Sequence, residues 1–212
     1  MKINILPLTL ISCLNLGFSQ DTEKSKKLLD KVSASMESKE SIQFDFAYVL
    51  ENKKENIQQE MDGKVTLAGD KYQLELLGIT RTFDGEKIYT IVPENEEITI
   101  TSPEDAEDIG INPSELLRFY ENGYSYEWDI LQLQSGRSIQ FVKLIPEEKN
   151  EDVQYILLGI DINRNEVYRI IQIGENQTST TLTLQNQVFN VRLSDDFFEV
   201  NTADYPDYYI NN

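Results

Sequence analysis

Apolar and polar residues alternate along most of this 212-residue chain, in short runs separated by turns. The run Ile42–Glu51 illustrates the pattern, because large apolar side chains occupy alternate positions in it: Phe44, Phe46, Tyr48 and Leu50. A period of two is typical of a strand with one buried face. The same reasoning predicts further strands at Met61–Ala68, Tyr72–Leu77, Ile79–Phe83, Lys87–Val92, Glu97–Thr101, Tyr124–Leu131, Arg137–Ile145, Gln154–Asp161, Glu166–Gly174 and Thr178–Phe189.

The segments between these runs have the composition of turns. Gly69-Asp70 and Asp84-Gly85 are typical hairpin turns, and the polar stretch Asn52–Gln59 is predicted as a turn as well. The pattern therefore predicts a mainly β (α+β) fold, built on one antiparallel sheet of about eleven strands. Strand twist curls a sheet of that size into a barrel or part of one.

Two segments have helical features. Asp21–Glu40 carries one apolar stripe, formed by Leu28, Leu29, Val32 and Met36. The second predicted helix, Asn112–Gly123, has a capping residue at its start and a glycine after its end. A helix of about three turns is marginal alone, so its apolar side chains need a surface to cover.

The apolar faces of the strands and of the second helix allow two interpretations. They form an ordinary packed core, or they line a concave sheet under a lid that holds a ligand. The second interpretation places a lipid-binding site between the sheet residues Phe44, Phe46, Tyr48, Leu50, Tyr72, Leu74, Leu76, Ile88 and Ile98 and the lid residues Leu116, Leu117, Phe119 and Tyr120. The C-terminal stretch is predicted to begin with a short turn at Ser194–Asp196 that buries Phe197 or Phe198.

The first residues have the pattern of a secretory signal peptide. One lysine is followed by an apolar run from Ile3 to Leu16, and small residues precede a cleavage point ahead of Gln20. This predicts a signal peptide at 1–19 and one domain at 20–212. The string Leu10–Cys13 also resembles a lipobox, in which case Cys13 would be lipidated.

Composition excludes several kinds of chemistry. The formal charge is −18, which repels nucleic acid. The chain has no histidine, and its one cysteine lies in the predicted signal segment. Disulfides, thiol nucleophiles, Ser-His-Asp triads and imidazole metal sites are therefore not expected.

Acidic residues remain as possible ligands or catalysts. The loop run Glu94–Glu97 and the run Glu104–Asp108 contain several carboxylates, but solvated acidic loops are the commoner case. Asp161–Asn165 begins like a calcium loop and lacks the later glycine and glutamate, so it is interpreted as a hairpin turn. No catalytic residue, metal or cofactor is predicted, and the chain is not expected to be an enzyme.

Several strings resemble the periplasmic lipoprotein carrier family LolA, particularly its members from Bacteroidetes. They cover most of the predicted domain in family order and spacing: KKLLDKVSASMES, IQFDFAYVLEN, GKVTLAGDKYQLEL, TFDGEKIYTIVPENEEITI, INPSELLRFYENGYSYEW and VRLSDDFFEVNTADYP. The resemblance implies an unclosed antiparallel β-barrel whose apolar concave face lies under a helical lid. It also implies a soluble periplasmic monomer that accepts acylated lipoproteins from an inner-membrane ABC-type exporter. Release at the outer membrane would involve an acceptor there.

The chain departs from the family at one position. Some members carry an arginine on the first strand that ties the barrel to the lid, whereas Ile42–Leu50 contains none. The nearest basic candidates are Arg81, Arg118 and Arg137. A lipidated or partner-coupled half-barrel, acting as lipoprotein acceptor or envelope-stress sensor, is the alternative function.

Overall fold

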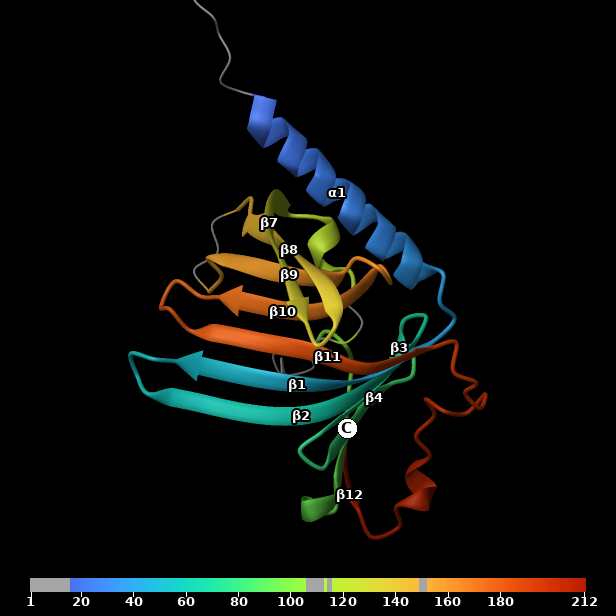
Figure 1. Cartoon of the computed structure of the whole chain (residues 1–212). Helices are drawn as coiled ribbons and strands as arrows, with labels where there is room; N and C mark the ends of the chain where they lie inside the picture. The colour runs from blue at the N-terminus through green and yellow to red at the C-terminus, as the bar shows by residue number, and fades with distance from the viewer. Residues whose placement is uncertain (1–15, 106–112, 114–115, 149–151) are drawn as a thin grey trace, which may run out of the picture.

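One continuous sheet of twelve strands forms the body of the described chain, and it does not close into a barrel (Figure 1). The computed structural model describes residues 16–105, 113, 116–148 and 152–212, and the side chains from residue 21 onward within that part. A long helix, α1 (Leu16–Glu37), runs diagonally across one end of the sheet (Figure 1). The two edges of the sheet remain separate, so the architecture is an unclosed barrel with a helix, as predicted.

The strands follow one another as hairpins in two groups. The first group comprises β1 (Ile42–Asn52), β2 (Ile57–Ala68), β3 (Lys71–Leu76), β4 (Ile79–Phe83), β5 (Ile88–Val92) and β6 (Glu97–Thr101). The second comprises β7 (Tyr124–Gln134), β8 (Arg137–Pro146), β9 (Tyr155–Asp161), β10 (Glu166–Ile173) and β11 (Ser179–Phe189). Short 3-10 helices lie at η1 (Pro93–Asn95), η2 (Phe119–Glu121) and η3 (Thr202–Asp204), and β12 (Tyr209–Asn211) ends the series.

The order across the sheet is β12-β6-β5-β4-β3-β2-β1-β11-β10-β9-β8-β7. Strand β11 returns to pair with β1 and so joins the two groups, with Phe46 opposite Leu184. All pairs are antiparallel except β12 with β6. Strands β7 and β12 are therefore the two open edges.

Alternation predicted the eleven longer strands well. Their observed bounds differ by a few residues, and the largest difference is in β2, which begins at Ile57 within the stretch predicted as a turn. Strand β12 was not predicted. Phe198 is buried after the turn that follows Ser194, as expected for one of the two phenylalanines.

The predicted helix at Asn112–Gly123 is wrong over the residues that the structure describes. Asn112 itself lies outside them, whereas residues 116–118 form turns and only Phe119–Glu121 is helical, as a single 3-10 turn. Leu117 and Tyr120, three residues apart, are both buried against the sheet. Tyr120 lies inside the 3-10 turn and Leu117 just before it, since the hydrogen bond of that turn runs from the Glu121 N–H to the Arg118 carbonyl at 3.0 Å.

One apolar cluster links α1, the 116–121 segment and the concave face of the sheet. The helix contributes its predicted stripe, Leu28, Leu29, Val32 and Met36, and Val32 is fully buried. Of the predicted signal segment 1–19, the structure describes only residues 16–19, which form the start of α1. Within the described part of the chain, no helix is long and apolar enough to cross a membrane.

Candidate functional site

The concave face of the sheet is defined by the register of its strands. Residues that pair directly in an antiparallel sheet point to the same face. Phe44 pairs with Val65, which pairs with Leu74, and all three are buried in the apolar cluster. On the other side of β1, Tyr48 pairs with Leu182 and Phe46 with Leu184, so the same face continues across β11.

Helix α1 and the segment 116–121 cover only one part of this face. The helix packs mainly against β7, β10 and η2. Ser33 Oγ donates a hydrogen bond to Glu121 Oε1 at 2.5 Å, and Thr22 Oγ1 donates to the Tyr126 carbonyl at 3.3 Å. These bonds attach the helix to the 116–121 segment and to the first half of β7. The rest of β7 leaves Trp128, Leu131 and Leu133 exposed.

An open cavity of about 510 Å³ lies over the other half of the concave face. It adjoins the core through Leu74 and Leu76, and its apolar wall continues to Leu77 and Ile79. The remaining lining residues are polar: Arg81, Thr90, Thr99, Thr101, Asp105 and Asn211. Its volume is that of a small-ligand site, of roughly 300 to 1,000 Å³.

Among the described residues that line this cavity, Arg81 is the basic one, and its side chain is largely buried on β4. It pairs with Leu74 on one side and with Thr90 on the other, so the register directs it to the concave face. Burial raises the pKa of the nearby Tyr72 hydroxyl, and the Arg81 guanidinium acts in the opposite direction. Arg118, by contrast, is exposed, and Arg137 lies over the Tyr168 ring at 5.6 Å.

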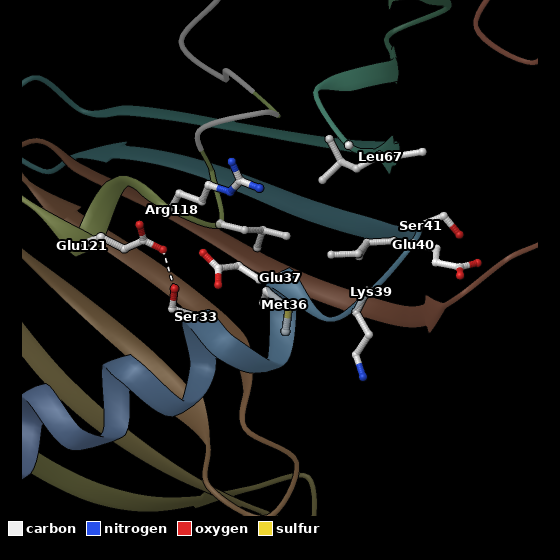
Figure 2. Close-up of a pocket in the computed structure, with 13 residues that line it drawn as sticks. Ser33, Met36, Glu37, Lys39, Glu40, Ser41, Leu67, Arg118 and Glu121 are labelled. Carbon is white, nitrogen blue, oxygen red and sulfur yellow. Dashed lines mark hydrogen bonds between the residues drawn. The ribbon is translucent and has the colours of Figure 1, made fainter.

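A smaller cavity of about 130 Å³ lies where α1 ends, between the helix, the start of β1 and the 117–121 segment (Figure 2). Met36 and Leu117 form part of its wall, and charged side chains including Lys39, Glu40 and Arg118 surround it. Its volume is well below that of a typical site for a small organic ligand. We therefore assign the 510 Å³ cavity, and not this small one, as the candidate site.

The structure brings most of the predicted site residues together. Phe44, Phe46, Tyr72, Leu74, Leu117 and Tyr120 are core residues, and Tyr48, Leu76, Leu116 and Phe119 pack against them. Leu50 shares the face of Tyr48 but lies beyond this cluster, where it pairs with Thr180. Of the predicted residues, only Leu74 and Leu76 line the 510 Å³ cavity.

The prediction that Ile98 lines the concave face is wrong, because Ile98 lies on the opposite face from Ile88. Ile88 pairs with Phe83 and Thr101, in line with Tyr72 on the concave face. Ile98 pairs instead with Ile91, and both are buried on the outer face. The alternation of side chains divides β6 into two faces correctly, but its more apolar face is the outer face and not the concave face.

The polar lining was not predicted, because only apolar residues were expected in a lipid site. Arg81 was considered only as a substitute for a first-strand arginine. A signal was available in the pattern of β4 to β6, since Arg81, Thr90 and Thr99 share the strand face of Ile79 and Ile88. A positive charge on a predicted inward face is unusual enough to indicate a role.

The acidic turn at Asp161 is a hairpin turn, as predicted. The Asp161 side chain, 3% exposed, accepts a hydrogen bond from the Asn163 N–H at 3.0 Å, and its carbonyl accepts one from the Asn165 N–H at 2.8 Å. Burial raises the pKa of Glu166 beside it. Throughout the described residues, no group of three or more carboxylates or other metal-binding side chains is arranged to hold a metal ion.

Comparisons with known proteins agree with this fold. An uncharacterised conserved protein from Thermus thermophilus has a similar structure, with a TM-score of 0.59 at 9% identity, over 88% of this chain and 98% of the other. LprF from Mycobacterium bovis is similar with a TM-score of 0.54 at 14% identity, over 82% of this chain and 96% of that one. Among curated proteins, no sequence matches this chain. A family model described as outer membrane lipoprotein carrier protein LolA matches residues 15–177, so the chain belongs to the LolA family.

Proposed function

We propose that this protein is a periplasmic chaperone that shields the acyl chains of lipoproteins and carries them from the inner to the outer membrane. Members of the family are binding or chaperone proteins rather than enzymes, and the family is periplasmic. An inner-membrane ABC-type exporter would supply the cargo, and an outer-membrane acceptor would receive it. The observation that carries the proposal is the open cavity beside the covered half of the concave face.

The geometry suits an apolar chain that must enter and leave. Leu74, Leu76, Leu77 and Ile79 offer an apolar wall that is continuous with the core. Each methylene removed from water contributes roughly 0.8 kcal/mol, so an acylated protein needs such a wall to cross the periplasm. The open side of the cavity allows release without unfolding, because α1 packs mainly over the other half of the sheet.

A charge introduced into the cavity wall tests the proposal. Ile79→Glu places a carboxylate where the acyl chain would lie, at a residue that is 37% exposed and therefore tolerates a polar side chain. We expect the purified variant to fold and to release at least about tenfold less lipoprotein from spheroplasts than the original protein. Native mass spectrometry of protein recovered from the periplasm should detect acylated cargo on the original protein and none on the variant.

Val188→Glu is the matched control. Val188 is also a β-branched strand residue, 51% exposed, and it pairs with Gln43 on the outer face. This variant should release lipoproteins normally. Equal release by Ile79→Glu and the original protein would contradict the proposed site, and failure of the original protein to release any lipoprotein would contradict the carrier function.

A further inference from the structure

We infer that the cavity binds an amphiphile with an anionic head, carboxylate or phosphate, and that Arg81 contacts this head while the apolar wall holds its chain. The inference rests on the proposed function, because it assumes that the cavity takes an acyl chain. It adds the chemical class of the head and the direction in which the ligand lies.

The cavity wall contains an apolar pair on β3 and β4 and, beside it, a row that crosses β3 to β6. The apolar pair is Leu76 with Ile79. The next row begins at Leu74 and then becomes polar, through Arg81, Thr90 and Thr99, which pair in succession. An apolar chain and a polar head would therefore find matching surfaces side by side, within one cavity.

Arg81 has the properties of a head-binding residue. Its side chain is 8% exposed in a concave surface, in a chain whose formal charge is −18. A guanidinium carries five N–H donors and no acceptor, in a planar fork that matches a carboxylate or phosphate. Charge-assisted hydrogen bonds of this kind are roughly twice as strong as neutral ones and strengthen further when water is excluded.

The other polar groups of the cavity also favour binding of the anionic head beside Arg81. Thr90 places a hydroxyl group in the same row as Arg81, and a hydroxyl donates as well as accepts. The Thr99 hydroxyl, in that row too, donates to Glu97 Oε1 at 3.4 Å. Asp105 also lines the cavity, but it is exposed and its Oδ2 accepts a hydrogen bond from Ser102 Oγ at 2.7 Å. An anion would be repelled from that rim and attracted to the buried guanidinium.

A ligand series on the purified full chain tests the inference. Palmitate, hexadecyl phosphate and methyl palmitate have the same chain length and differ in their heads. Each would displace a neutral fluorescent apolar probe, N-phenyl-1-naphthylamine, whose emission rises on binding. We expect palmitate or hexadecyl phosphate to bind about tenfold more tightly than methyl palmitate, since the ester lacks the charge.

Arg81→Gln tests the residue. This variant should bind the preferred anion about tenfold more weakly, and its affinity for methyl palmitate should not change. Its thermal unfolding is measured to verify that it folds. If Arg81→Gln does not fold, Thr90→Val, which removes one hydroxyl from the same row, replaces it and should lower the preference for the anion severalfold.

The outcomes separate this inference from the proposed function. Equal affinities of the original protein for the three ligands would overturn head recognition and leave the acyl site intact. An unchanged preference in the folded Arg81→Gln variant would also overturn it, because the head would then bind elsewhere. If none of the three ligands displaces the probe, the acyl site itself is wrong.

Discussion

The ring of Phe46 lies directly against the backbone of Gly63, the residue with which it pairs across β1 and β2. A Cβ atom on Gly63 would lie 2.7 Å from Phe46 Cε1 and 2.7 Å from the Glu75 carbonyl oxygen. Only glycine leaves room for this ring. The contact sets the position of an aromatic side chain in the centre of the concave face.

Gly63→Ala should therefore displace Phe46 into the concave face. We expect it to lower the free energy of unfolding by about 1–3 kcal/mol, as overpacking does, and to weaken binding of acyl ligands. Urea denaturation and probe displacement measure the two effects.

Gly159→Ala is the control for that variant. A Cβ at Gly159 would lie 2.9 Å from Phe141 Cε1, but Gly159 and Phe141 pair on the outer face of β9 and β8. It should destabilise the fold to a similar extent and leave ligand affinity unchanged. Loss of binding in both variants would indicate a general loss of stability in place of a local effect on Phe46.

Two substitutions of Tyr120 should distinguish the stability that its ring contributes by packing from the effect of its hydroxyl. The side chain is fully buried, and its hydroxyl has no hydrogen-bond partner among the described residues. Burial, with the charges of Glu121 and Glu37, raises the pKa of this hydroxyl. We expect Tyr120→Phe to keep or increase stability by up to about 1 kcal/mol and Tyr120→Ala to lose about 3–5 kcal/mol, measured by urea unfolding. A large loss in Tyr120→Phe would show that the hydroxyl does stabilise the fold.

The turn at Asp84 should make part of the stability depend on pH. Partial burial acts to raise the pKa of the Asp84 carboxyl, but the N–H groups of Lys87 and Glu86, each 2.8 Å from Oδ1, hold that pKa below its usual range. A lowered pKa stabilises the fold above the unfolded pKa of about 4, and this contribution is lost as the pH falls through the folded value.

Asp84→Asn tests that dependence. It should cost about 1 kcal/mol at pH 7, and the difference from the original protein should disappear on acidification to about pH 2. Asp70→Asn, at the exposed turn between β2 and β3, is the control and should change little. A difference that stays constant with pH would mean that the charge of Asp84 plays no part.

Strand β12 protects the edge of β6. The Tyr209 N–H donates to the Glu96 carbonyl at 2.8 Å, and Ile210 pairs with Ile98. Tyr209→Pro removes that donor and should free the β6 edge, which then pairs with another molecule. Size-exclusion chromatography with light scattering should detect a larger mass for this variant and not for Asn212→Pro. If both variants keep the mass of the original protein, the edge is protected by other means.

The eleven longer strands were predictable because each shows the alternation of apolar and polar residues within its own sequence. The turns at Gly69 and Asp84 and the apolar stripe of α1 are also local signals, and they were interpreted correctly. The segment 116–121 was not predictable in this way. Its capping residues favour a helix, but the segment buries Leu117 in an irregular turn and Tyr120 in one 3-10 turn, both against a distant sheet.

The errors about the site have a related cause. Alternation divides β6 into two faces, and nothing within the strand indicates which face is concave. Its isoleucines therefore suggested the concave side, whereas the register assigns that side to Thr99 and Thr101. Strand β12 is three residues long and pairs with a strand far away in the sequence, so no local pattern indicates it. The cavity depends on all of these pairings together.

The exposed part of β7 that begins at Trp128 gives the protein an intrinsic fluorescent reporter. Trp128 is the single tryptophan of the chain, 36% exposed, and it pairs with the fully buried Val142 beside the part of β7 that α1 covers. Its emission spectrum thus describes one place in the molecule. Displacement of the helix changes the water around that one indole. Movement of α1 can then be followed in real time on the unlabelled protein.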